Sequence, residues 1–337
     1  MKKAVFLYDD GLKNMLAQVY PDRVLKKIAE QYDLIDGFVS NKELAQRAEE
    51  LKQVQAIFSS WWMPALQKEE IQQFFPRLEI VFYGAGSVQY FARPFLELGI
   101  KVVSGWVANG VPVAEYTVSQ IVLANKGFFQ NTRIMHGGNV AAARSFTEAC
   151  YGNYGARVGI LGAGTIGRRV IGMLTNNYHM DVSVYDPYLS SQKAEAMGVR
   201  KCTIEEIFSK CDVISNHVAK LPATEGMIHY ELLKLMKPYA TLINTGRGSQ
   251  IVEADLIRAL TEVPTRTALL DVTDPEPPLP ESPLYTMDNV VLSSHIAGSV
   301  SNEVERIGEY MIDESTRFAQ NSPLQYEVTL KALETMA

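Results

Sequence analysis

The chain has 337 residues, which is enough for about two domains, and 47% of them are hydrophobic, which is ample for two cores. Its formal net charge is −6 and it contains no run of basic residues, so neither nucleic acid nor an anionic membrane is an expected partner. The first apolar run, Ala4–Tyr8, stops at two aspartates and is too short for a signal peptide or a membrane span. We therefore expect a cytoplasmic protein whose first strand is buried.

Three cysteines, Cys150, Cys202 and Cys211, are spread along the chain without a C-x-x-C pair. An odd number of widely spaced cysteines in a long chain is typical of free thiols in a reducing compartment, and it disfavours a disulfide or a zinc site. We expect no metal. Any proton that a reaction needs must then come from a side chain.

Residues 1–104 alternate short apolar runs, expected as strands, with amphipathic segments, expected as helices. One helix should begin at Ser40, because Ser40 and Glu43 have capping-box spacing. This alternation predicts a parallel sheet with helices on both faces. The expected strands are Ala4–Tyr8, Gly37–Ser40, Ala56–Ser59, Leu78–Tyr83 and Ile100–Val103, and the other expected helices are near Arg23–Gln31, Leu66–Phe75 and Phe91–Leu98.

A short glycine motif, Gly84-Ala85-Gly86, follows the run that ends at Tyr83. It lacks a third glycine and a later acidic residue at the right spacing, so we do not expect a second nucleotide site here. Its backbone N–H groups are suited to a smaller anion such as a carboxylate.

Pro112 is expected to open a long apolar helix over Val113–Ala124, because proline at the first helical position loses no hydrogen bond. We interpret this helix as the crossing between two domains. A looser region that contains several glycines, 137–155, should follow it.

The most informative stretch is Val158–Gly167, in which an apolar strand runs into glycines at 162, 164 and 167 and then into a helix over Ile166–Leu174. Gly162 permits a tight turn, Gly164 lets a pyrophosphate approach the backbone, and Gly167 lets the helix pack close to the strand. The N–H groups at the start of the helix, around Thr165 and Ile166, would face the phosphates. This pattern predicts a dinucleotide site.

A second strand, Asp181–Tyr185, ends at Asp186, about 20 residues beyond the third glycine, where the carboxylate that binds the ribose is expected. Pro187 and Tyr188 follow it, so no basic residue is placed to neutralise a 2′-phosphate. NAD is therefore favoured over NADP.

Six apolar runs between 157 and 292 are expected as strands of a second sheet: Val158–Leu161, Val182–Tyr185, Val213–Ile214, Leu242–Ile243, Ala268–Leu270 and Val290–Leu292. Each run ends in glycine or polar residues. Open parallel sheets bind ligands at the carboxyl ends of their strands, so these ends should share one crevice. The strand ends are the glycine turn, Asp186, Ser215–His217, Asn244–Gly248, Asp271 and Ser293–His295. After the sheet, the sequence predicts a helix near Asn302–Ala319 and a short tail.

In their order along the chain, these motifs resemble the D-isomer-specific 2-hydroxyacid dehydrogenase family. The resemblance implies an α/β fold of two Rossmann-like or flavodoxin-like domains with parallel sheets and an active site in the cleft between them. It implies a substrate-binding domain from residues 1–111 and 300–337, and an NAD-binding domain from 112–299. The residues that carry it are Gly84–Gly86, Asn109, Val113–Glu115, Gly162–Gly167, Asp186, His217, Asn244–Gly248, Asp271–Val272, Glu276–Pro277 and His295–Gly298.

The resemblance makes His295 the acid/base, Glu276 its carboxylate partner and Arg247 the substrate anchor. Reduction of a 2-keto acid turns the carbonyl oxygen into an alkoxide-like centre that must be protonated. Histidine changes charge near neutral pH, and a neighbouring carboxylate favours its protonated form. Arginine keeps its proton and binds a carboxylate through two parallel hydrogen bonds.

Further site residues are implied by the resemblance or by their position. Trp61, with Trp62, is suited to a wall of the substrate pocket, although a place in an aromatic core is the better-supported alternative. A homodimer is expected, since relatives pair through the region of the helix that begins at Val113. The other expected cofactor-binding residues are His217, Thr245, Gly246, Asp271 and Gly298, and the other expected substrate-binding residues are Ala85, Gly86 and Asn109, with Ala85 and Gly86 acting through their backbone N–H groups.

Three departures from the family pattern bear on loop shape and substrate choice. Ala219 stands where the family usually has proline, Ser293-Ser294 where it has Thr-Pro, and Thr273 where an aromatic residue is common. They leave the expected catalytic atoms in place.

The expected activity is the NAD-dependent interconversion of a small anionic 2-keto acid and an (R)-2-hydroxy acid. The alternative is an NAD(H)-sensing, corepressor-like binding protein, which the complete set of Arg247, Glu276 and His295 disfavours. Formate oxidation is disfavoured as well, because relatives with that activity pair the histidine with glutamine. The sequence does not identify the acid.

Overall fold

The computed structural model describes residues 1–9 and 13–334, and the chain divides into two compact units. The first unit combines both ends of the chain, 1–110 and 299–337, and the second unit is the continuous segment 111–298. None of the helices in the described residues is long and apolar enough to cross a membrane.

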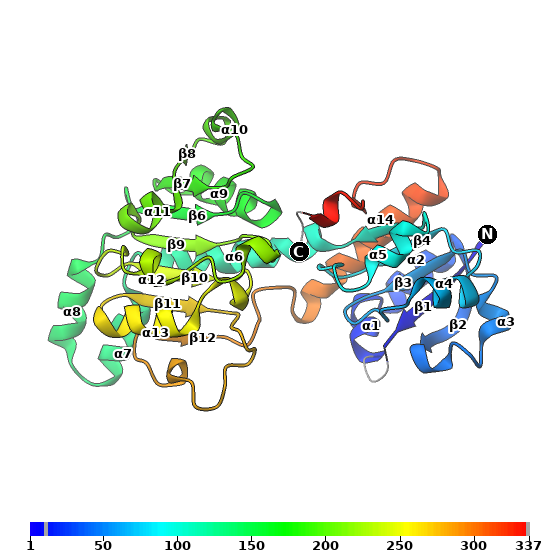
Figure 1. The fold of residues 1–337 in the computed structure, drawn as a ribbon, viewed down its shortest axis with the longest axis horizontal. Coiled ribbons are helices and arrows are strands. Elements are labelled where there is room, and N and C mark those ends of the chain that lie inside the picture. Colours follow the sequence, from blue (N-terminus) through cyan, green and yellow to red (C-terminus); the bar gives the residue numbers. More distant parts are fainter. Residues whose placement is uncertain (10–12, 335–337) are drawn as a thin grey trace. The chain divides into compact units, whose positions relative to one another are not determined.

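The first unit contains a six-stranded sheet in the order β13-β5-β4-β3-β1-β2 (Figure 1). Strands β1 to β5 are parallel, and β13 pairs with β5 in the antiparallel direction. The order 2-1-3-4-5 of the parallel strands is that of flavodoxin-like folds. The bounds are β1 (Lys2–Tyr8), β2 (Tyr32–Ser40), β3 (Ala56–Ser59), β4 (Ile80–Tyr83), β5 (Lys101–Ser104) and β13 (Glu327–Val328).

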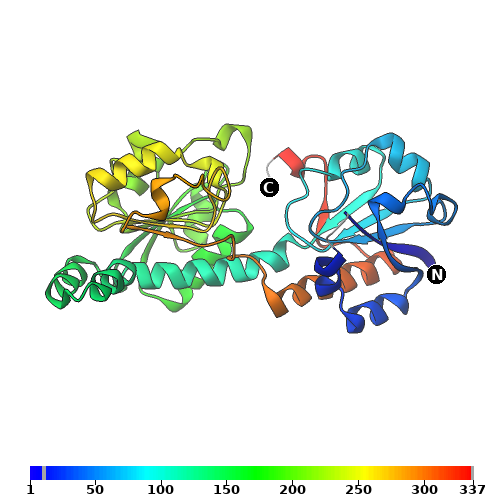
Figure 2. The same cartoon turned by 90° about the horizontal axis from the view of Figure 1, so that it is seen from below.

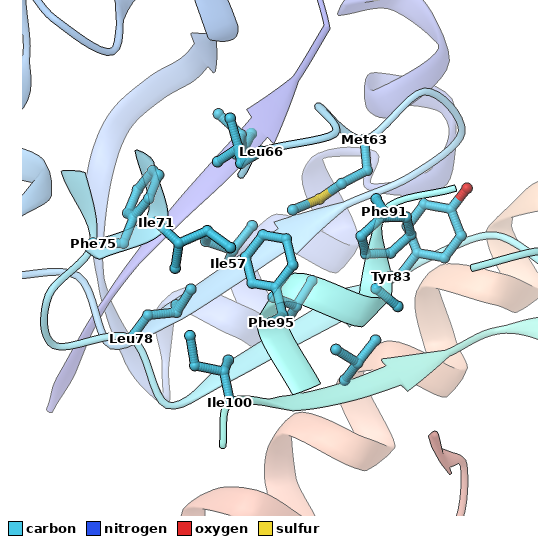
Figure 3. Packing of buried hydrophobic residues seen from close by; sticks show 14 of the residues in the cluster. Ile57, Met63, Leu66, Ile71, Phe75, Leu78, Tyr83, Phe91, Phe95 and Ile100 are labelled. Carbon is cyan, nitrogen blue, oxygen red and sulfur yellow. The ribbon is translucent and has the colours of Figure 1, made fainter. Parts of the chain in front are cut away.

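Helices cover both faces of this sheet because successive strand residues point to opposite faces. Ile57 and Val81 lie in one core cluster, whereas their neighbours Phe58 and Phe82 lie in the other. Figure 3 shows the first cluster, with Ile57 of β3 beside Ile71 and Phe95 from two helices. This face carries α3 (Ala48–Leu51), α4 (Lys68–Phe74) and α5 (Ala92–Glu97), and the other face carries α1 (Lys13–Val19), α2 (Asp22–Ala29) and α14 (Val304–Ala319).

The second unit contains a seven-stranded parallel sheet in the order β12-β11-β10-β9-β6-β7-β8 (Figure 1). Its strand order reverses between β6 and β9, which is the position where Rossmann-type sheets bind dinucleotides. The bounds are β6 (Arg157–Leu161), β7 (Asp181–Tyr185), β8 (Arg200–Lys201), β9 (Val213–Asn216), β10 (Thr241–Asn244), β11 (Thr267–Leu270) and β12 (Val290–Leu292).

The helices of the second unit also form two layers, and Figure 2 shows α6 and α13 on opposite faces of the sheet. One core cluster joins the sheet to α6 (Trp106–Ala124), α9 (Thr165–Asn177) and α10 (Ser191–Ala196). The other joins it to α11 (Ile204–Lys210), α12 (Tyr230–Leu233) and α13 (Glu253–Glu262). The predicted α/β fold is confirmed, with two sheets of mostly parallel strands and β13 as the antiparallel exception among the described strands.

The expectation that Pro112 opens a helix is wrong, because α6 begins at Trp106 and contains Pro112 in its interior. Proline forfeits the bond to the carbonyl four residues earlier and costs about 3 kcal/mol inside a helix. Ala108 and Ala114, on either side of it, are fully buried, so packing supports the helix across this position. The boundary between the two units, at Gly110–Val111, falls just before this proline.

The region expected to be loose, 137–155, contains a helix, α8 (Val140–Ala149), that pairs with α7 (Phe128–His136). Asn139 caps α8 by accepting a hydrogen bond from the N–H of Ala142 at 3.0 Å. The glycines that suggested a loop lie only at the two sides of α8. In contrast, the expected helix at Ser40 is a single 3₁₀ turn, η1 (Asn41–Glu43), although its capping box is present.

Candidate active site

The glycine turn between β6 and α9 has two glycines that the fold itself requires and one that it does not. Gly162 has φ +87°, and a Cβ there would lie 2.9 Å from the carbonyl oxygen of His217. A Cβ on Gly167 would lie 2.0 Å from the carbonyl oxygen of Gly162, so only glycine lets α9 start this close to β6. A Cβ on Gly164, by contrast, would meet nothing within 4 Å. The space in front of Gly164 fits the pyrophosphate of a dinucleotide.

Asp186 lies at the end of β7 and is hydrogen-bonded back to this turn. Its Oδ2 accepts from the N–H of Ala163 at 2.7 Å, and its Oδ1 accepts from the N–H groups of Tyr188 and Leu189 at 2.7 and 3.1 Å. A carboxylate has about four acceptor positions, so acceptor capacity remains for a ribose diol. On the other side of the turn, Arg168 donates from Nε to the carbonyl of Ala163 at 2.6 Å, a contact that the sequence analysis missed.

A buried amide network joins the ends of β9 and β10. Asn216 donates through Nδ2 to Oδ1 of Asn244 and to Oε1 of Gln250, at 3.0 and 2.6 Å. The side chain of Asn244 in turn donates to the carbonyl of Arg247 at 3.0 Å and accepts from the N–H of Gly246 at 3.1 Å. Asn216 and Gln250 were not among the predicted site residues, although Asn216 was recognised as part of a polar strand end.

His217 and Thr245, both expected near the cofactor, are held by hydroxyl groups. Nε2 of His217 lies 2.9 Å from Oγ of Ser215, and Oγ1 of Thr245 lies 3.1 Å from Oγ1 of Thr117 on α6. Burial lowers the pKa of His217 to about 4, so its ring is neutral at pH 7. A neutral ring is consistent with lining a cleft and not with donating a proton in the reaction.

Arg247 follows the end of β10 and is only partly exposed. Its Nη1 donates to the carbonyl of Gly246 at 2.7 Å, which leaves most of its N–H donors for other partners. Burial lowers the pKa of Arg247, and the nearby charge of Glu276 acts in the opposite direction. The guanidinium remains charged at neutral pH, because its ordinary pKa is above 12.

His295 and Glu276 form a direct pair. Nδ1 of His295 lies 2.7 Å from Oε1 of Glu276, and about half of each side chain is exposed. This bond leaves Nε2 on the opposite side of the imidazole ring. Because Glu276 also acts electrostatically on Arg247, the three residues predicted to be catalytic lie in one neighbourhood of the second unit.

The turn that carries His295 is held by Asp271, which is 2% exposed. The Oδ1 atom of Asp271 accepts from Oγ of Ser293 at 2.7 Å and from the N–H of Ile296 at 2.8 Å, and Oδ2 accepts from the N–H of Ala297 at 2.9 Å. His295 itself has φ +58°, a rare conformation for a residue other than glycine. The backbone at His295 is thus oriented by the end of the neighbouring strand β11, a contact that the sequence analysis missed.

Of the expected substrate-binding residues of the first unit, Ala85 and Gly86 lie in the loop after β4, Asn109 lies on α6, and Trp61 follows β3. The N–H of Ala85 already donates to the carbonyl of Tyr83 at 2.9 Å, which leaves Gly86 as the better candidate for binding an anion. Asn109 accepts from the N–H of Ser299 at 3.0 Å, and its Nδ2 would lie 3.6 Å from a Cβ on Gly86. Trp61 is half-buried against both core clusters, as its alternative assignment proposed.

No cluster of three or more His, Cys, Asp or Glu side chains suited to a metal occurs within residues 1–9 and 13–334. The thiols of Cys150, Cys202 and Cys211 are free, and burial raises the pKa of Cys211 to about 12.

A family profile described as "D-isomer specific 2-hydroxyacid dehydrogenase, NAD binding domain" matches residues 118–297. The chain belongs to this family. The family's NAD-binding domain therefore lies in the second unit, around the glycine turn, and both the predicted family and the predicted cofactor are confirmed.

Members of the family that are similar in sequence include the D-3-phosphoglycerate dehydrogenases of Methanocaldococcus jannaschii and Archaeoglobus fulgidus. The first is 33% identical over 219 residues, which cover 65% of this chain and 41% of the relative. The second is 29% identical over 236 residues, which cover 70% of this chain and 44% of the relative. The chain thus spans less than half the length of these curated relatives.

Solved structures of dehydrogenases share this fold. Apo D-mandelate dehydrogenase from Rhodotorula graminis has a TM-score of 0.81 at 19% identity, with 97% of this chain and 98% of that one covered. The NAD complex of the D-isomer-specific 2-hydroxyacid dehydrogenase from Lactobacillus delbrueckii ssp. bulgaricus has a TM-score of 0.76 at 18% identity, with 97% and 100% covered.

Proposed function

We propose that this protein is an NAD-dependent dehydrogenase that interconverts a 2-keto acid and an (R)-2-hydroxy acid. The observation that carries the proposal is the 2.7 Å pair of His295 and Glu276 at the strand ends of an NAD-binding domain of this family. The charged group of Arg247 lies within electrostatic reach of the same glutamate.

His295 is the proton donor in this proposal. The carboxylate of Glu276 holds Nδ1, so Nε2 faces the substrate and can protonate the carbonyl oxygen as it becomes an alkoxide. When bound, the nicotinamide supplies or accepts the hydride. In the direction of oxidation, His295 takes the hydroxyl proton, and Glu276 stabilises the resulting imidazolium.

Arg247 is the substrate anchor. Among the described residues, its guanidinium donates to the carbonyl of Gly246, and its remaining donors match the two oxygens of a carboxylate. Its partial burial strengthens this charge-assisted contact, since the interaction is less screened than in water. In the first unit, the backbone at Gly86 and the side chain of Asn109 are proposed as further substrate contacts, with Ala85 and Trp61 as secondary ones.

The proposal assigns cofactor binding to the glycine turn and the strand ends around it. The pyrophosphate binds at the start of α9, against Gly162, Gly164, Gly167 and the backbone of Thr165 and Ile166. Asp186 binds the ribose. The other proposed contacts line the same edge of the sheet: His217, Thr245, Gly246, Asp271 and Gly298. The absence of a basic residue directly after Asp186 supports a preference for NAD over NADP.

The test is a spectrophotometric panel of 2-keto acids with NADH, covering glyoxylate, pyruvate, hydroxypyruvate, phenylpyruvate and branched acids. At least one should be reduced, and the product should be the (R)-2-hydroxy acid by chiral chromatography. If NADH binds and no member of the panel is turned over, the dehydrogenase proposal fails in favour of an NAD(H)-sensing protein.

We also propose a homodimer. Apolar side chains of α6, α7 and α8 are well exposed, with Leu123 at 37%, Phe128 at 44% and Val140 at 46%. Clustered exposed apolar surface of this kind is typical of a protein interface. Light scattering should give a mass of twice 37.5 kDa, and Phe128→Glu should lower it; a monomeric wild-type protein would refute the dimer.

A further inference from the structure

The carboxyl ends of the parallel strands of the first unit carry two exposed aromatic rings. We infer that this edge selects 2-keto acids with a large, uncharged, apolar side chain, and that Trp62 and Tyr90 form the surface that the side chain contacts. The inference rests on the dehydrogenase activity proposed above and identifies its substrate class.

The backbone of Trp62 is held in a conformation that a bulky side chain disfavours. It has φ +65° and 59% of its surface is exposed, although it directly precedes the fully buried Met63. A bulky residue with positive φ is a genuine outlier, and such strain persists where the surrounding structure imposes it. Here the N–H of Asp9, at the end of β1, donates to the carbonyl of Trp62 at 3.2 Å. The backbone thus presents this indole ring to solvent at the sheet edge.

Tyr90 presents its ring beside the same segment. Its hydroxyl lies 3.4 Å from the hydroxyl of the buried Tyr83, and the backbone of Met63 and Trp62 is near enough to affect its pKa. The ring packs edge-on against Phe91 at 5.1 Å between centroids, yet 48% of the residue remains exposed. Figure 3 shows Met63, Tyr83 and Phe91 close together in the core cluster of this face. Tyr90 is therefore a fixed aromatic surface.

Charges near this surface disfavour an anionic side chain on the substrate. Burial is the main cause of the raised pKa of Tyr90, and the negative charge of Asp9 makes a smaller contribution in the same direction. The carboxylate of Asp9 therefore acts on the Tyr90 hydroxyl. Among the three positions after each of β1, β3, β4 and β5, those that the structure describes contain no lysine or arginine. Lys13 and Arg93 come later, in α1 and α5, and Arg93 lies 3.9 Å from the carboxylate of Glu97. Lys42 follows β2, the outermost strand of the sheet. Lys2, Lys3 and Lys101 stand at the opposite ends of β1 and β5, where each pairs with an acid.

These features together separate two classes of 2-keto acid. A phosphorylated side chain needs arginine, lysine or a dedicated anion site to replace its hydration. An aromatic or branched side chain needs only flat apolar surface, and aromatic pairs gain further from edge-on or offset stacking. The edge formed by Trp62 and Tyr90 offers the second kind of contact. The relatives named D-3-phosphoglycerate dehydrogenase would then differ from this protein in substrate.

The experiment compares kcat/KM with NADH for phenylpyruvate, glyoxylate and 3-phosphohydroxypyruvate. Phenylpyruvate should exceed 3-phosphohydroxypyruvate by about 100-fold or more, because a pocket that lacks the partners of a charged group discriminates strongly against it. Trp62→Ala should lower the phenylpyruvate-to-glyoxylate ratio by roughly 10-fold or more, since glyoxylate has no side chain to lose contact.

Two further variants serve as controls for the effect of Trp62→Ala. Trp62→Gly removes the same ring and accepts the positive φ without strain, so it should fold and should lower the ratio to a similar extent. Tyr154→Ala, at an 88% exposed aromatic residue of the second unit, should leave the ratio unchanged. If both Trp62 variants keep the wild-type ratio, or if 3-phosphohydroxypyruvate is the better wild-type substrate, this inference is wrong while the dehydrogenase activity stands. If no 2-keto acid is reduced, the proposed function itself fails.

Discussion

His295 is held from two sides by two different carboxylates. Glu276 binds the imidazole at Nδ1, and Asp271 binds the backbone of the turn through Ile296 and Ala297. The first contact fixes the tautomer and orientation of the ring, whereas the second fixes the backbone that carries it. A proton donor needs both, because proton transfer requires hydrogen-bond distance as well as the correct protonation state.

His295→Ala should lower kcat by about 10²- to 10⁴-fold, which is the usual contribution of a positioned proton donor. Glu276→Gln should cause a smaller loss, since an amide can still orient the ring but carries no charge. NADH binding, measured by fluorescence titration, should be largely kept in both. The matched control is His136→Ala, at an exposed histidine whose Nδ1 lies 2.8 Å from the carbonyl oxygen of Thr132. A wild-type rate for His295→Ala would refute the assignment.

Asp186 combines ligand recognition with support of the turn, and two substitutions separate these functions. Asp186→Asn retains one acceptor oxygen, which can accept either from the N–H of Ala163 or from those of Tyr188 and Leu189, whereas Asp186→Ala loses all three contacts. Both substitutions should weaken NAD binding and reduce the preference for NAD over NADP, because the ribose loses its carboxylate partner. Only the alanine variant should also lower thermal stability markedly. Dissociation constants for NADH and NADPH test this, and unchanged selectivity in both variants would exclude Asp186 as the ribose ligand.

At the scale of elements, the join between β6 and α9 depends on the absence of side chains. Gly162 faces the end of β9 at His217, and Gly167 faces Gly162, so three segments meet with no space for a Cβ. Gly159 in β6 has the same property, since a Cβ there would lie 2.4 Å from the side chain of Ile207 on α11. The strand is therefore covered closely on this face as well as at its end.

Gly167→Ala should destabilise the fold by about 1–3 kcal/mol or more, since its Cβ would lie 2.0 Å from a backbone oxygen that cannot move without opening the turn. Gly172→Ala in the same helix is the matched control, because its Cβ meets nothing within 4 Å. The control should raise stability by roughly 0.5–1 kcal/mol through better helix propensity. Urea unfolding measures both changes, and equal effects would show that close packing at Gly167 is unimportant.

At the scale of the whole molecule, each unit buries a two-sided sheet, and the first unit is assembled from both ends of the chain. The C-terminal segment adds α14 and β13 to the first unit, and Gly308 on α14 lies so close to α1 that a Cβ would be 2.1 Å from the carbonyl oxygen of Val19. We therefore expect the free energy of unfolding to depend on groups buried in the middle of the sequence as well as on those near its two ends.

His217 couples that stability to pH. Its pKa in the folded protein is about 4, below the ordinary value of 6.5, so the unfolded chain binds a proton first as the pH falls. Its contribution is fully present above pH 6.5 and is lost between about pH 6.5 and 4, by up to about 3 kcal/mol. The free energy of unfolding should fall more in wild type than in His217→Gln between pH 7.5 and 4.5. Parallel curves for the two proteins would contradict this coupling.

Local sequence patterns were enough to predict both sheets and most of the candidate site. The six expected strands of the second unit are all present, because fully buried parallel strands are short continuous apolar runs. Gly162 and Gly167 mark the turn because a Cβ on either would clash with a backbone oxygen, whereas Gly164 leaves open space for a ligand. Glu276 and His295 were paired by resemblance, and their contact follows from adjacent strand ends.

Features that depend on contacts between residues distant in sequence could not be predicted from local sequence patterns. Strands β8 and β13 have two residues each and exist only because β7 and β5 offer them a free edge. The helix across Pro112 forms because its neighbours are buried, although the local preference is to begin at proline. The same holds for Asp271, since nothing local to it indicates that its carboxylate binds Ser293, Ile296 and Ala297. Local propensity is set by adjacent residues, whereas these contacts arise from packing between segments that only the folded chain brings together.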